Sequence, residues 1–379
     1  MITHQRARSV LLAAVGLVAI ACAVKGFGNA LGSSQDFQWS PAHLFTQGEN
    51  PYTVYRDGTD RILLYQAPNY LHALYLLLSP IGFAPFIIAK ALWAVVNIAL
   101  VAGATAFMAR QQRWSWVAVG FLLAAVFIAT PTRTALASGQ QTFLVFAMFA
   151  AAFHSSRSLV AGVSLAVAIT KYSFAPPMLL VLALRRRWPT VGVAAGVSVL
   201  AVVVFGVVTS TPIVTAMFQP LAVNQTSVGF GAADLMTLTQ GVLSLSNTSL
   251  VPYVAGIFGC LGLMFIARRA ITETDWLGAL AIGSAISLLC FKHLLYDFVF
   301  LIPIAIVATR LPTLARAFAL GAVAYFWFAY QAFGWVGISA SNPAVTAVSF
   351  AVLLLAFTAV VGCWPRTNSP LKDGCNAGH

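Results

Sequence analysis

The chain has 379 residues, of which 60% are hydrophobic and only 8% are charged, whereas charged residues make up roughly a quarter of an ordinary soluble domain. So few polar side chains cannot cover a water-soluble globule, and a chain this rich in apolar residues is not disordered either. Long apolar runs separated by short charged clusters predict an all-α polytopic membrane protein, with residues 1–379 forming a single integral membrane domain.

The net charge of +12 comes from 21 Lys and Arg residues against 9 Asp and Glu residues. Most of the basic residues lie at the ends of apolar runs, which is typical of cytoplasmic loops and does not indicate a nucleic-acid partner. The five cysteines have neither metal-site spacing nor positions in the expected outer loops, so neither a metal site nor a disulfide framework is predicted.

The amino terminus carries Arg6 and Arg8 before an apolar run. This pattern resembles a signal peptide, but many further hydrophobic segments follow it. We therefore expect an uncleaved first span.

Apolar runs long enough, or nearly long enough, to cross a bilayer recur along the chain. They predict about ten full spans, at residues 9–28, 84–109, 116–131, 139–154, 189–210, 250–267, 275–291, 297–310, 316–333 and 345–364. Two regions are ambiguous. Residues 68–81 are short and end at Pro80, which suggests a helix along the membrane surface. Residues 159–184 are interrupted by Lys171, Pro176 and Pro177, which suggests a broken helical hairpin.

Placing the amino terminus in the cytoplasm puts the other basic clusters on the same side, namely Arg110 with Arg113, Arg157, Arg185-Arg186-Arg187, Arg268-Arg269, Arg310 with Arg316, and Arg366. The predicted location is the inner (plasma) membrane, with both termini and the tail 365–379 cytoplasmic. Residues 29–67 and 211–249 then form the main outer loops. One extra crossing in either ambiguous region would invert all that follows it.

Most of the acidic residues fall on this outer side, which suggests that the chemistry lies there: Asp36, Glu49, Asp57, Asp60, Asp234 and Asp297. Asp36 follows the first span by a few residues. Its carboxylate is either an ordinary solvated group or a general base at the membrane surface. Lys171 interrupts an apolar run, and a charge inside a membrane segment usually has a function.

The first outer loop combines Asp36, an aromatic-rich stretch and the motif Gly48-Glu49-Asn50-Pro51-Tyr52. This arrangement resembles glycosyltransferase family 87, a group of membrane-embedded GT-C enzymes. Further pieces match in order: Ser138-Gly139-Gln140-Gln141, Thr170-Lys171-Tyr172 with Pro176-Pro177 and Arg185-Arg186-Arg187-Trp188, Asn224-Gln225-Thr226-Ser227, and Phe291-Lys292-His293 with Tyr296-Asp297. The resemblance spans residues 30–300. The chain departs from the family at Gln141-Thr142, where relatives more often carry a small residue and Asn.

The resemblance implies transfer of a hexose, with mannose as the first candidate, from a polyprenyl-phosphate sugar to an acceptor hydroxyl on the outer face, with inversion. It implies Asp36 as the general base. Cations near the outer half of the membrane would bind the donor phosphate: Lys171, His293, Lys292 and Arg133. Sugar or acceptor contacts are expected from Gln140, Asn224, Gln225, Tyr52 and Asp297. The acceptor could be a glycolipid, a polysaccharide or a protein, and no metal cofactor is expected.

Two other functions share this architecture. A secondary transporter or a lipid or glycolipid flippase would also be polytopic and basic inside, but transporters usually repeat their broken helices in two halves. The sequence shows no partner in its second half for the broken segment at 159–184. A membrane acyltransferase or polymer ligase is disfavoured by the motif that follows the early Asp. A glycosyltransferase is therefore the main prediction, with a transporter or flippase as the alternative.

Overall fold

The computed structural model describes residues 2–227, 231–246, 249–338 and 342–363, without the side chains of residues 2–12, 65, 224–227 and 334. The predicted tail 365–379, Arg366 and the side chains of Arg6 and Arg8 lie outside the described part. Every regular element within it is helical. The first half contains α1 (Ile2–Gly32), α2 (Trp39–Thr46), α3 (Pro51–Arg56), η1 (Leu63–Tyr65), α4 (Ala73–Gly82), α5 (Phe86–Gln111), α6 (Trp116–Ile128), α7 (Thr130–Ser138), α8 (Thr142–His154), α9 (Ser158–Ala168) and α10 (Ala175–Leu184).

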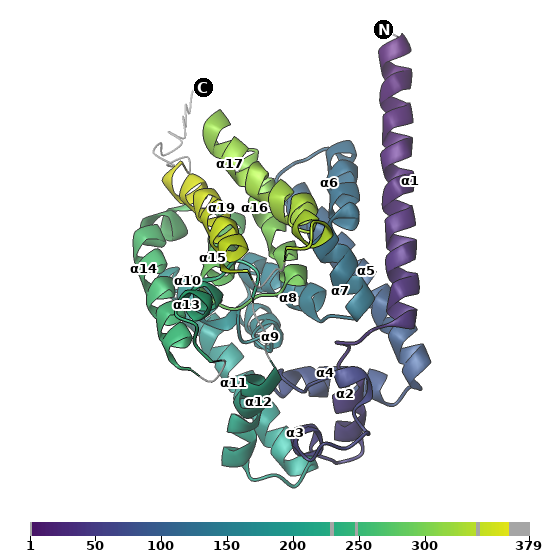
Figure 1. The fold of residues 1–379 in the computed structure, drawn as a ribbon, viewed down its shortest axis with the longest axis vertical. Helices are drawn as coiled ribbons and strands as arrows, with labels where there is room; N and C mark the ends of the chain where they lie inside the picture. The colour runs from purple at the N-terminus through teal and green to yellow at the C-terminus, as the bar shows by residue number, and fades with distance from the viewer. Residues whose placement is uncertain (1, 228–230, 247–248, 339–341, 364–379) are drawn as a thin grey trace, which may run out of the picture.

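The second half continues with helices of similar composition (Figure 1). They are α11 (Trp188–Val208), α12 (Ile213–Ser227), α13 (Leu235–Val242), α14 (Val251–Glu273), α15 (Trp276–Cys290), η2 (Leu295–Leu301), α16 (Ile302–Ala308), α17 (Thr313–Ala324), η3 (Tyr325–Ala329), α18 (Ala332–Trp335) and α19 (Pro343–Gly362). The predicted all-α fold is confirmed for the described residues.

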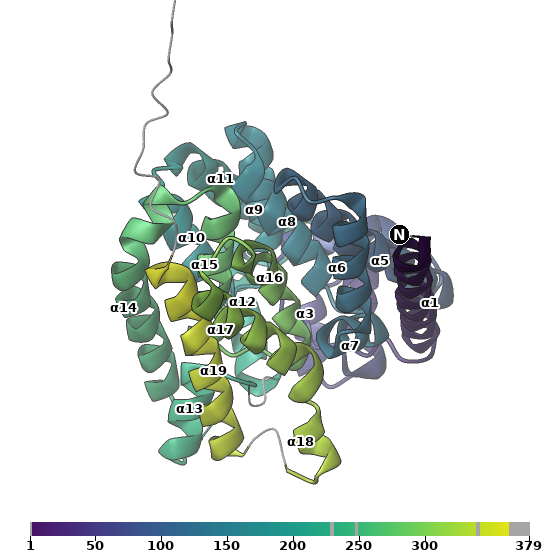
Figure 2. The same cartoon turned by 90° about the horizontal axis from the view of Figure 1, so that it is seen from above.

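Five helices in the described part are long and apolar enough to cross a membrane, namely α1, α5, α11, α14 and α19. They expose large apolar side chains, such as Leu17, Val199 and Phe258, each more than 60% accessible. Because a soluble protein rarely presents so much apolar surface, these faces are suited to lipid. In Figure 2, α1 is seen nearly end-on at the edge of the bundle, beside α5, α6 and α7. The chain is therefore a membrane protein.

The predicted count of ten full spans is not confirmed. The run at 116–131 continues into α7 after a 61° bend between α6 and α7, and this pair would make a sixth span. Several other runs, including 139–154, 275–291 and 297–310, hold apolar helices of 10–17 residues, shorter than the roughly 20 residues needed to cross the hydrocarbon core without help. The apolar runs at these positions are themselves shorter than this length, so the helices within them are short as well.

The predicted break within residues 159–184 is present. α9 ends at Ala168, α10 begins at Ala175, and Lys171 lies in the turn between them. Prolines 176 and 177 fall in the first turn of α10, where a missing N–H costs no helical hydrogen bond. α9 packs mainly on α8 and α11, whereas α10 packs on α14 and α15. The break therefore sends the chain from one part of the bundle to another.

One end of the molecule is a lobe of short helices, α2, α3, α4 and α12, drawn at the bottom of Figure 1. The predicted surface segment 68–81 contains α4, which packs closely on α2. A Cβ at Gly82 would lie 3.0 Å from the backbone of Ala42. Asn50 caps α3 and donates to Thr211 and Gln219 across 2.8 and 3.0 Å, so it ties the two predicted outer segments together.

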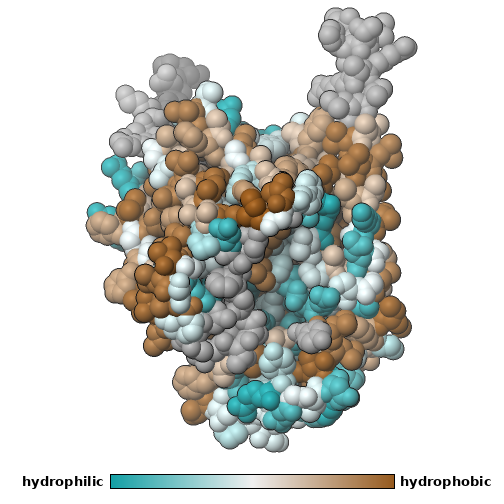
Figure 3. Space-filling view, viewed as in Figure 1, coloured by the Kyte–Doolittle hydropathy of each residue, from teal (hydrophilic) through white to brown (hydrophobic). Residues whose placement is uncertain are grey.

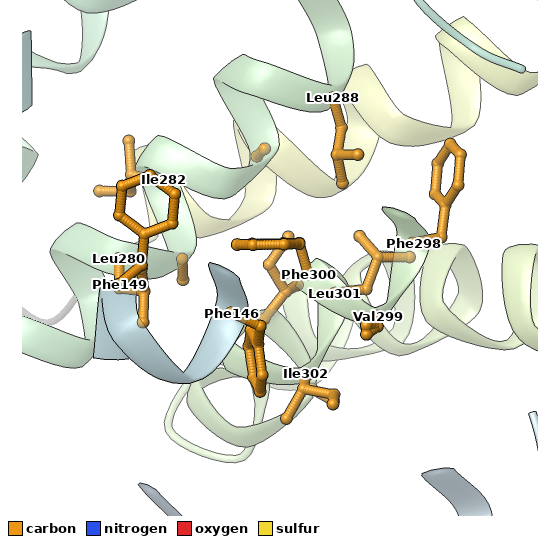
Figure 4. Close-up of a cluster of buried hydrophobic side chains, with 14 of the residues drawn as sticks. Phe146, Phe149, Leu280, Ile282, Leu288, Phe298, Val299, Phe300, Leu301 and Ile302 are labelled. Carbon is orange, nitrogen blue, oxygen red and sulfur yellow. The ribbon is translucent and has the colours of Figure 1, made fainter. Parts of the chain in front are cut away.

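The core of the bundle is centred on α15, which is buried along its length from Leu277 to Cys290. Figure 4 shows Phe146 and Phe149 of α8 close to Phe300 and its neighbours on η2. The Phe300 ring lies 5.3 Å from that of Phe146 and stacks on Phe174 at 3.9 Å. This packing holds the 291–297 turn, which joins α15 to η2, on a rigid base.

Candidate active site

A cavity of about 690 Å³ lies where the lobe meets the bundle. Its walls come from the segment after α1, the loop before α4, the turn between α9 and α10, and the 291–297 turn. Hydrophilic side chains line a hollow in the middle of the face shown in Figure 3, with apolar surface above it. The charged groups along the cavity are Asp36, Lys171, Lys292 and Asp297. Five tyrosines also line it: Tyr55, Tyr70, Tyr172, Tyr253 and Tyr296.

The backbone around Asp36 is fixed by the last two residues of α7. The Ser34 N–H donates to the Ala137 carbonyl at 3.0 Å, and the Asp36 N–H donates to the Ser138 carbonyl at 2.9 Å. Two segments about a hundred residues apart in the sequence are therefore joined next to the carboxylate. A side chain held in this way is preorganised for proton transfer.

Gly139 makes this junction possible. Its φ of +67° ends α7 in the left-handed region, which favours glycine. A Cβ at this position would lie 2.8 Å from the Phe37 Cβ. From α5, Trp93 stacks on Phe37 and donates to the Gly139 carbonyl at 2.9 Å, and Asn97 donates to the Gln140 carbonyl at 3.1 Å. The Asp36 loop and the Gln140 turn thus share one support.

The Asp36 carboxylate is half-buried at the cavity wall. Burial raises its pKa above the ordinary value of 3.8, and a hydrogen bond from the Gln140 side chain and the charge of Lys171 oppose this rise. Partial burial of this kind makes a carboxylate a better proton acceptor at neutral pH.

Tyr70 lines the same wall of the cavity, and Tyr52 lies behind Tyr70. The Tyr70 hydroxyl donates to Gln140 Oε1 at 3.1 Å. The Tyr52 hydroxyl donates to the Tyr70 carbonyl at 2.7 Å, and its fully buried side chain is not among those that line the cavity. Tyr52 therefore supports the wall from inside the lobe.

Lys171 and Asp297 form an ion pair at the cavity wall, and the side chains of both are nearly inaccessible. Thr142 completes the arrangement, because its hydroxyl donates to Asp297 Oδ1 at 3.0 Å and accepts from Lys171 Nζ at 3.0 Å. The Lys171 ammonium also lies 4.7 Å from the centre of the Tyr296 ring. The charge of Lys171 is thus compensated from several sides, as a charge in a membrane segment requires.

His293 lies behind this ion pair and is buried. Its Nδ1 is 3.0 Å from Asp297 Oδ2, and its Nε2 is 3.0 Å from the Ser287 hydroxyl. The Phe174 ring packs against the imidazole at 4.2 Å. His293 does not line the cavity, so it acts on the site through its contact with Asp297.

Lys292 precedes His293 and does line the cavity. Its side chain is half-buried, and burial lowers its pKa while the negative charge of Asp234 raises it. Among the described residues, no carboxylate lies within 4.0 Å of the Lys292 ammonium. Lys292 therefore differs from Lys171, whose charge is paired.

Among the predicted site residues whose side chains the structure describes, Arg133, Tyr52 and His293 do not line the cavity. Arg133, on α7, donates to Thr130 at 3.2 Å and is not a lining residue. The side chains of Asn224 and Gln225 lie outside the described part, although their backbone belongs to α12. The structure thus groups Asp36, Gln140, Lys171, Lys292 and Asp297 around one cavity, with His293 behind it.

Several residues at or next to the cavity were not predicted from the sequence to be site residues. Asn69 and Tyr70 lie in a loop before an apolar segment, and neither belongs to a recognisable motif. Thr142 attracted notice only as a departure from a family pattern. Its position one residue after Gln141, at the start of α8, could have indicated a polar helix end facing the site.

The arrangement can serve a reaction that moves a proton near one wall and leaves negative charge near the other. Asp36 can accept a proton, and two lysines lie along the same cavity. Within the described residues, no group of three His, Cys, Asp or Glu side chains could hold a metal ion. The five tyrosines add hydroxyl groups and flat aromatic rings to its walls.

The family model of glycosyltransferase family 87 matches residues 73–291, more than half of the chain. Lys171 and Gln140 fall inside the matched range, whereas Asp36 precedes it and Asp297 follows it. Neither a curated protein nor a solved structure matches the chain.

Proposed function

This chain belongs to glycosyltransferase family 87 and is therefore a membrane glycosyltransferase, and from that premise we propose its donor, chemistry and orientation. The enzyme moves a hexose, with mannose as the first candidate, from a polyprenyl-phosphate sugar to an acceptor hydroxyl on the outer face of the membrane. The observation that carries this proposal is the shared cavity, in which a half-buried carboxylate and two lysines face the same space.

In the proposed reaction Asp36 is the general base. The acceptor oxygen attacks the anomeric carbon of the sugar from the side opposite the phosphate, and the new C–O bond forms as the bond to phosphate breaks. Asp36 takes the hydroxyl proton, and the lipid phosphate leaves with its electron pair. A single displacement of this kind inverts the anomeric centre, and a positioned base typically contributes about 10²- to 10⁴-fold to the rate.

The leaving phosphate needs positive charge nearby. Lys292 is the first candidate for direct contact, because its ammonium has no carboxylate partner among the described residues. Lys171 contributes its charge from within the pair with Asp297. His293 supports that pair from behind, through Asp297.

The sugar is proposed to lie between these two regions. Gln140 and Asn69 offer amide groups to its hydroxyls, and Tyr70 orients the Gln140 side chain. The isoprenoid tail of the donor leaves the cavity beside apolar lining residues, Leu221, Met236 and Leu294. α14 continues this route with exposed apolar side chains such as Val254 and Phe258.

Contacts between the basic clusters support the proposed orientation in the plasma membrane. Arg185, at the end of α10, donates to the carbonyl groups of Ile271 and Thr274 at 2.7 and 2.8 Å. Arg310, after α16, pairs with Asp275 at 2.8 Å. These clusters gather at one end of α10 and α15, and the cavity lies at the other end of both helices. The basic end would be cytoplasmic, so the cavity would face outward.

The proposal is tested by transfer of radiolabelled sugar from polyprenyl-phosphate mannose to membrane lipid extracts, with purified wild type and Asp36→Asn compared. The exposed Asp60→Asn variant is the control. We expect Asp36→Asn to lose at least about a hundredfold in rate, to bind donor normally and to fold normally. Normal transfer by Asp36→Asn would place the base elsewhere. No transfer by the wild type with any polyprenyl-phosphate sugar would favour the transporter or flippase alternative, which substrate flux in proteoliposomes would then test.

A further inference from the structure

Asp234 is a fully buried carboxylate that the reaction described above does not use. It caps the amino end of α13, where its Oδ1 accepts from the Thr237 N–H at 2.7 Å. Its Oδ2 accepts from the Thr237 hydroxyl at 3.0 Å, and that hydroxyl in turn accepts from the Gly231 N–H at 2.8 Å. The second carboxylate oxygen of Asp234 thus connects α13 to the segment that begins at Gly231.

The segment that carries Asp234 is attached to the turn that carries Lys292. The Ala232 N–H donates to the His293 carbonyl at 2.9 Å. The Asp234 carboxylate fixes the same segment, through the Thr237 hydroxyl and the Gly231 N–H. The Tyr330 hydroxyl reaches the Ala232 carbonyl at 3.5 Å. The His293 carbonyl, directly beside Lys292, is therefore held by the segment that Asp234 fixes.

The two charged groups also act on each other. The positive charge of Lys292 lowers the pKa of Asp234, and the negative charge of Asp234 raises that of Lys292. The pKa of Asp234 is nevertheless raised to about 7, because burial is the largest influence on it. Asp234 is fully buried and does not line the cavity, whereas the Lys292 side chain does.

We propose that Asp234 is a positioning residue, which holds the 291–293 turn so that the Lys292 ammonium faces the phosphate of the lipid donor. This inference rests on the proposed function, in which Lys292 contacts that phosphate. Asp234 does not touch the substrate. Its effect is to limit where Lys292 can lie, so that less freedom is lost when the phosphate binds.

A double-mutant cycle tests the inference, with undecaprenyl phosphate in detergent micelles as the probe. Asp234→Ser keeps the cap of α13 but lacks the second oxygen, which accepts from the Thr237 hydroxyl. Lys292→Ala removes the proposed phosphate ligand. We expect each variant to weaken binding about tenfold, the cost of one charged hydrogen bond. The double variant should bind no more weakly than Lys292→Ala, because both changes remove one interaction.

The matched control is Asp275→Ser. Asp275 caps α15 through the Gly278 N–H at 2.8 Å, in the same way that Asp234 caps α13, but at the basic end of the bundle. This variant should bind the probe as the wild type does. Hydrogen exchange adds a readout without ligand: peptides that contain His293 should exchange faster in Asp234→Ser and normally in Asp275→Ser. If Asp234→Ser does not fold, the nearly isosteric Asp234→Asn should show both effects more weakly.

The outcomes separate the two proposals. Normal binding by Lys292→Ala, or no binding by the wild type, would overturn the proposed phosphate contact and this inference with it. Weak binding by Lys292→Ala together with normal binding by Asp234→Ser would overturn only the positioning role. The positioning role would also be overturned if the two losses of affinity multiplied in the double variant. Unchanged hydrogen exchange around His293 in Asp234→Ser would overturn it as well.

Discussion

Lys171 and Asp297 are 126 residues apart in the chain and form an ion pair at the wall of the cavity. Lys171 comes from the turn between α9 and α10, and Asp297 comes from η2. Each charge would be costly to bury alone at this depth. The pair thus explains how a lysine in an apolar run is accommodated, and it links the broken helix to the turn that carries Lys292.

Removing one partner of this pair should destabilise the protein strongly. Lys171→Met leaves Asp297 buried without its main positive partner, and we expect the free energy of unfolding to fall by about 3–5 kcal/mol. The double variant Lys171→Met/Asp297→Asn should lose less than the sum of the single variants. Thermal unfolding in detergent measures both effects. The exposed pair Arg269–Glu273 is the control, and Arg269→Gln should cost less than about 1 kcal/mol. Additive losses at Lys171 and Asp297 would contradict the coupling.

The rate of transfer should fall on the acid side at a pH above the ordinary Asp pKa. A general base works only when deprotonated, and burial raises the pKa of Asp36 above 3.8. Activity should therefore be lost as the pH falls through this raised pKa. The Gln140 hydrogen bond lowers the pKa of Asp36, so Gln140→Leu should shift the loss of activity to higher pH.

The pH profile of kcat/KM measures this shift. Gln47→Leu, at an exposed position in the same lobe, should leave the profile unchanged. A profile that moves to lower pH in Gln140→Leu, or does not move, would count against Asp36 as the base that Gln140 contacts.

Gly139→Ala should damage both stability and activity. The new methyl group would be forced against Phe37, at a φ that disfavours any residue with a Cβ. We expect the free energy of unfolding to fall by about 1–3 kcal/mol, and the transfer rate to fall because the Asp36 loop moves. In contrast, Gly192→Ala lies in α11 with nothing within 4 Å of the added Cβ. It should leave activity intact, and equal effects of the two substitutions would argue against the proposed support of Asp36.

Removing divalent metal ions should not reduce activity. The proposed reaction uses lysine side chains for the phosphate and Asp36 for the proton, so no step calls for a metal ion. The measurement is the transfer rate after dialysis against EDTA, with Mg²⁺ or Mn²⁺ added back to a parallel sample. A rate that falls with EDTA and recovers with either ion would show that the lysines alone do not neutralise the leaving phosphate.

The sequence carried enough information to predict the class of protein and its family. The scarcity of charge and the apolar runs required helices in a membrane, because only helices satisfy their own backbone hydrogen bonds there. Short motifs around Lys171 and Asn50 indicated the family that the comparison then confirmed. The break at Lys171 was also predictable, because a charge and two prolines cannot continue a spanning helix.

The sequence was less informative about helix lengths and about distant contacts. Apolar runs such as 139–154 and 275–291 gave the positions of α8 and α15, but not whether helices this short cross the membrane as full spans. The pairing of Lys171 with Asp297 and the contact between the Asp36 loop and Gly139 depend on residues far apart in the chain. So does the location of Tyr52 and Arg133 away from the cavity wall.

The sequence by itself therefore determined that the chain lies in a membrane and that its secondary structure is helical, because both follow from local hydrophobicity and backbone hydrogen bonding. The tertiary structure alone decided which polar groups meet. Each buried charge needs a partner, and folding selects that partner from any part of the chain. Lys171 thus became a paired charge, while Lys292 was left to face the cavity beside a segment that Asp234 fixes.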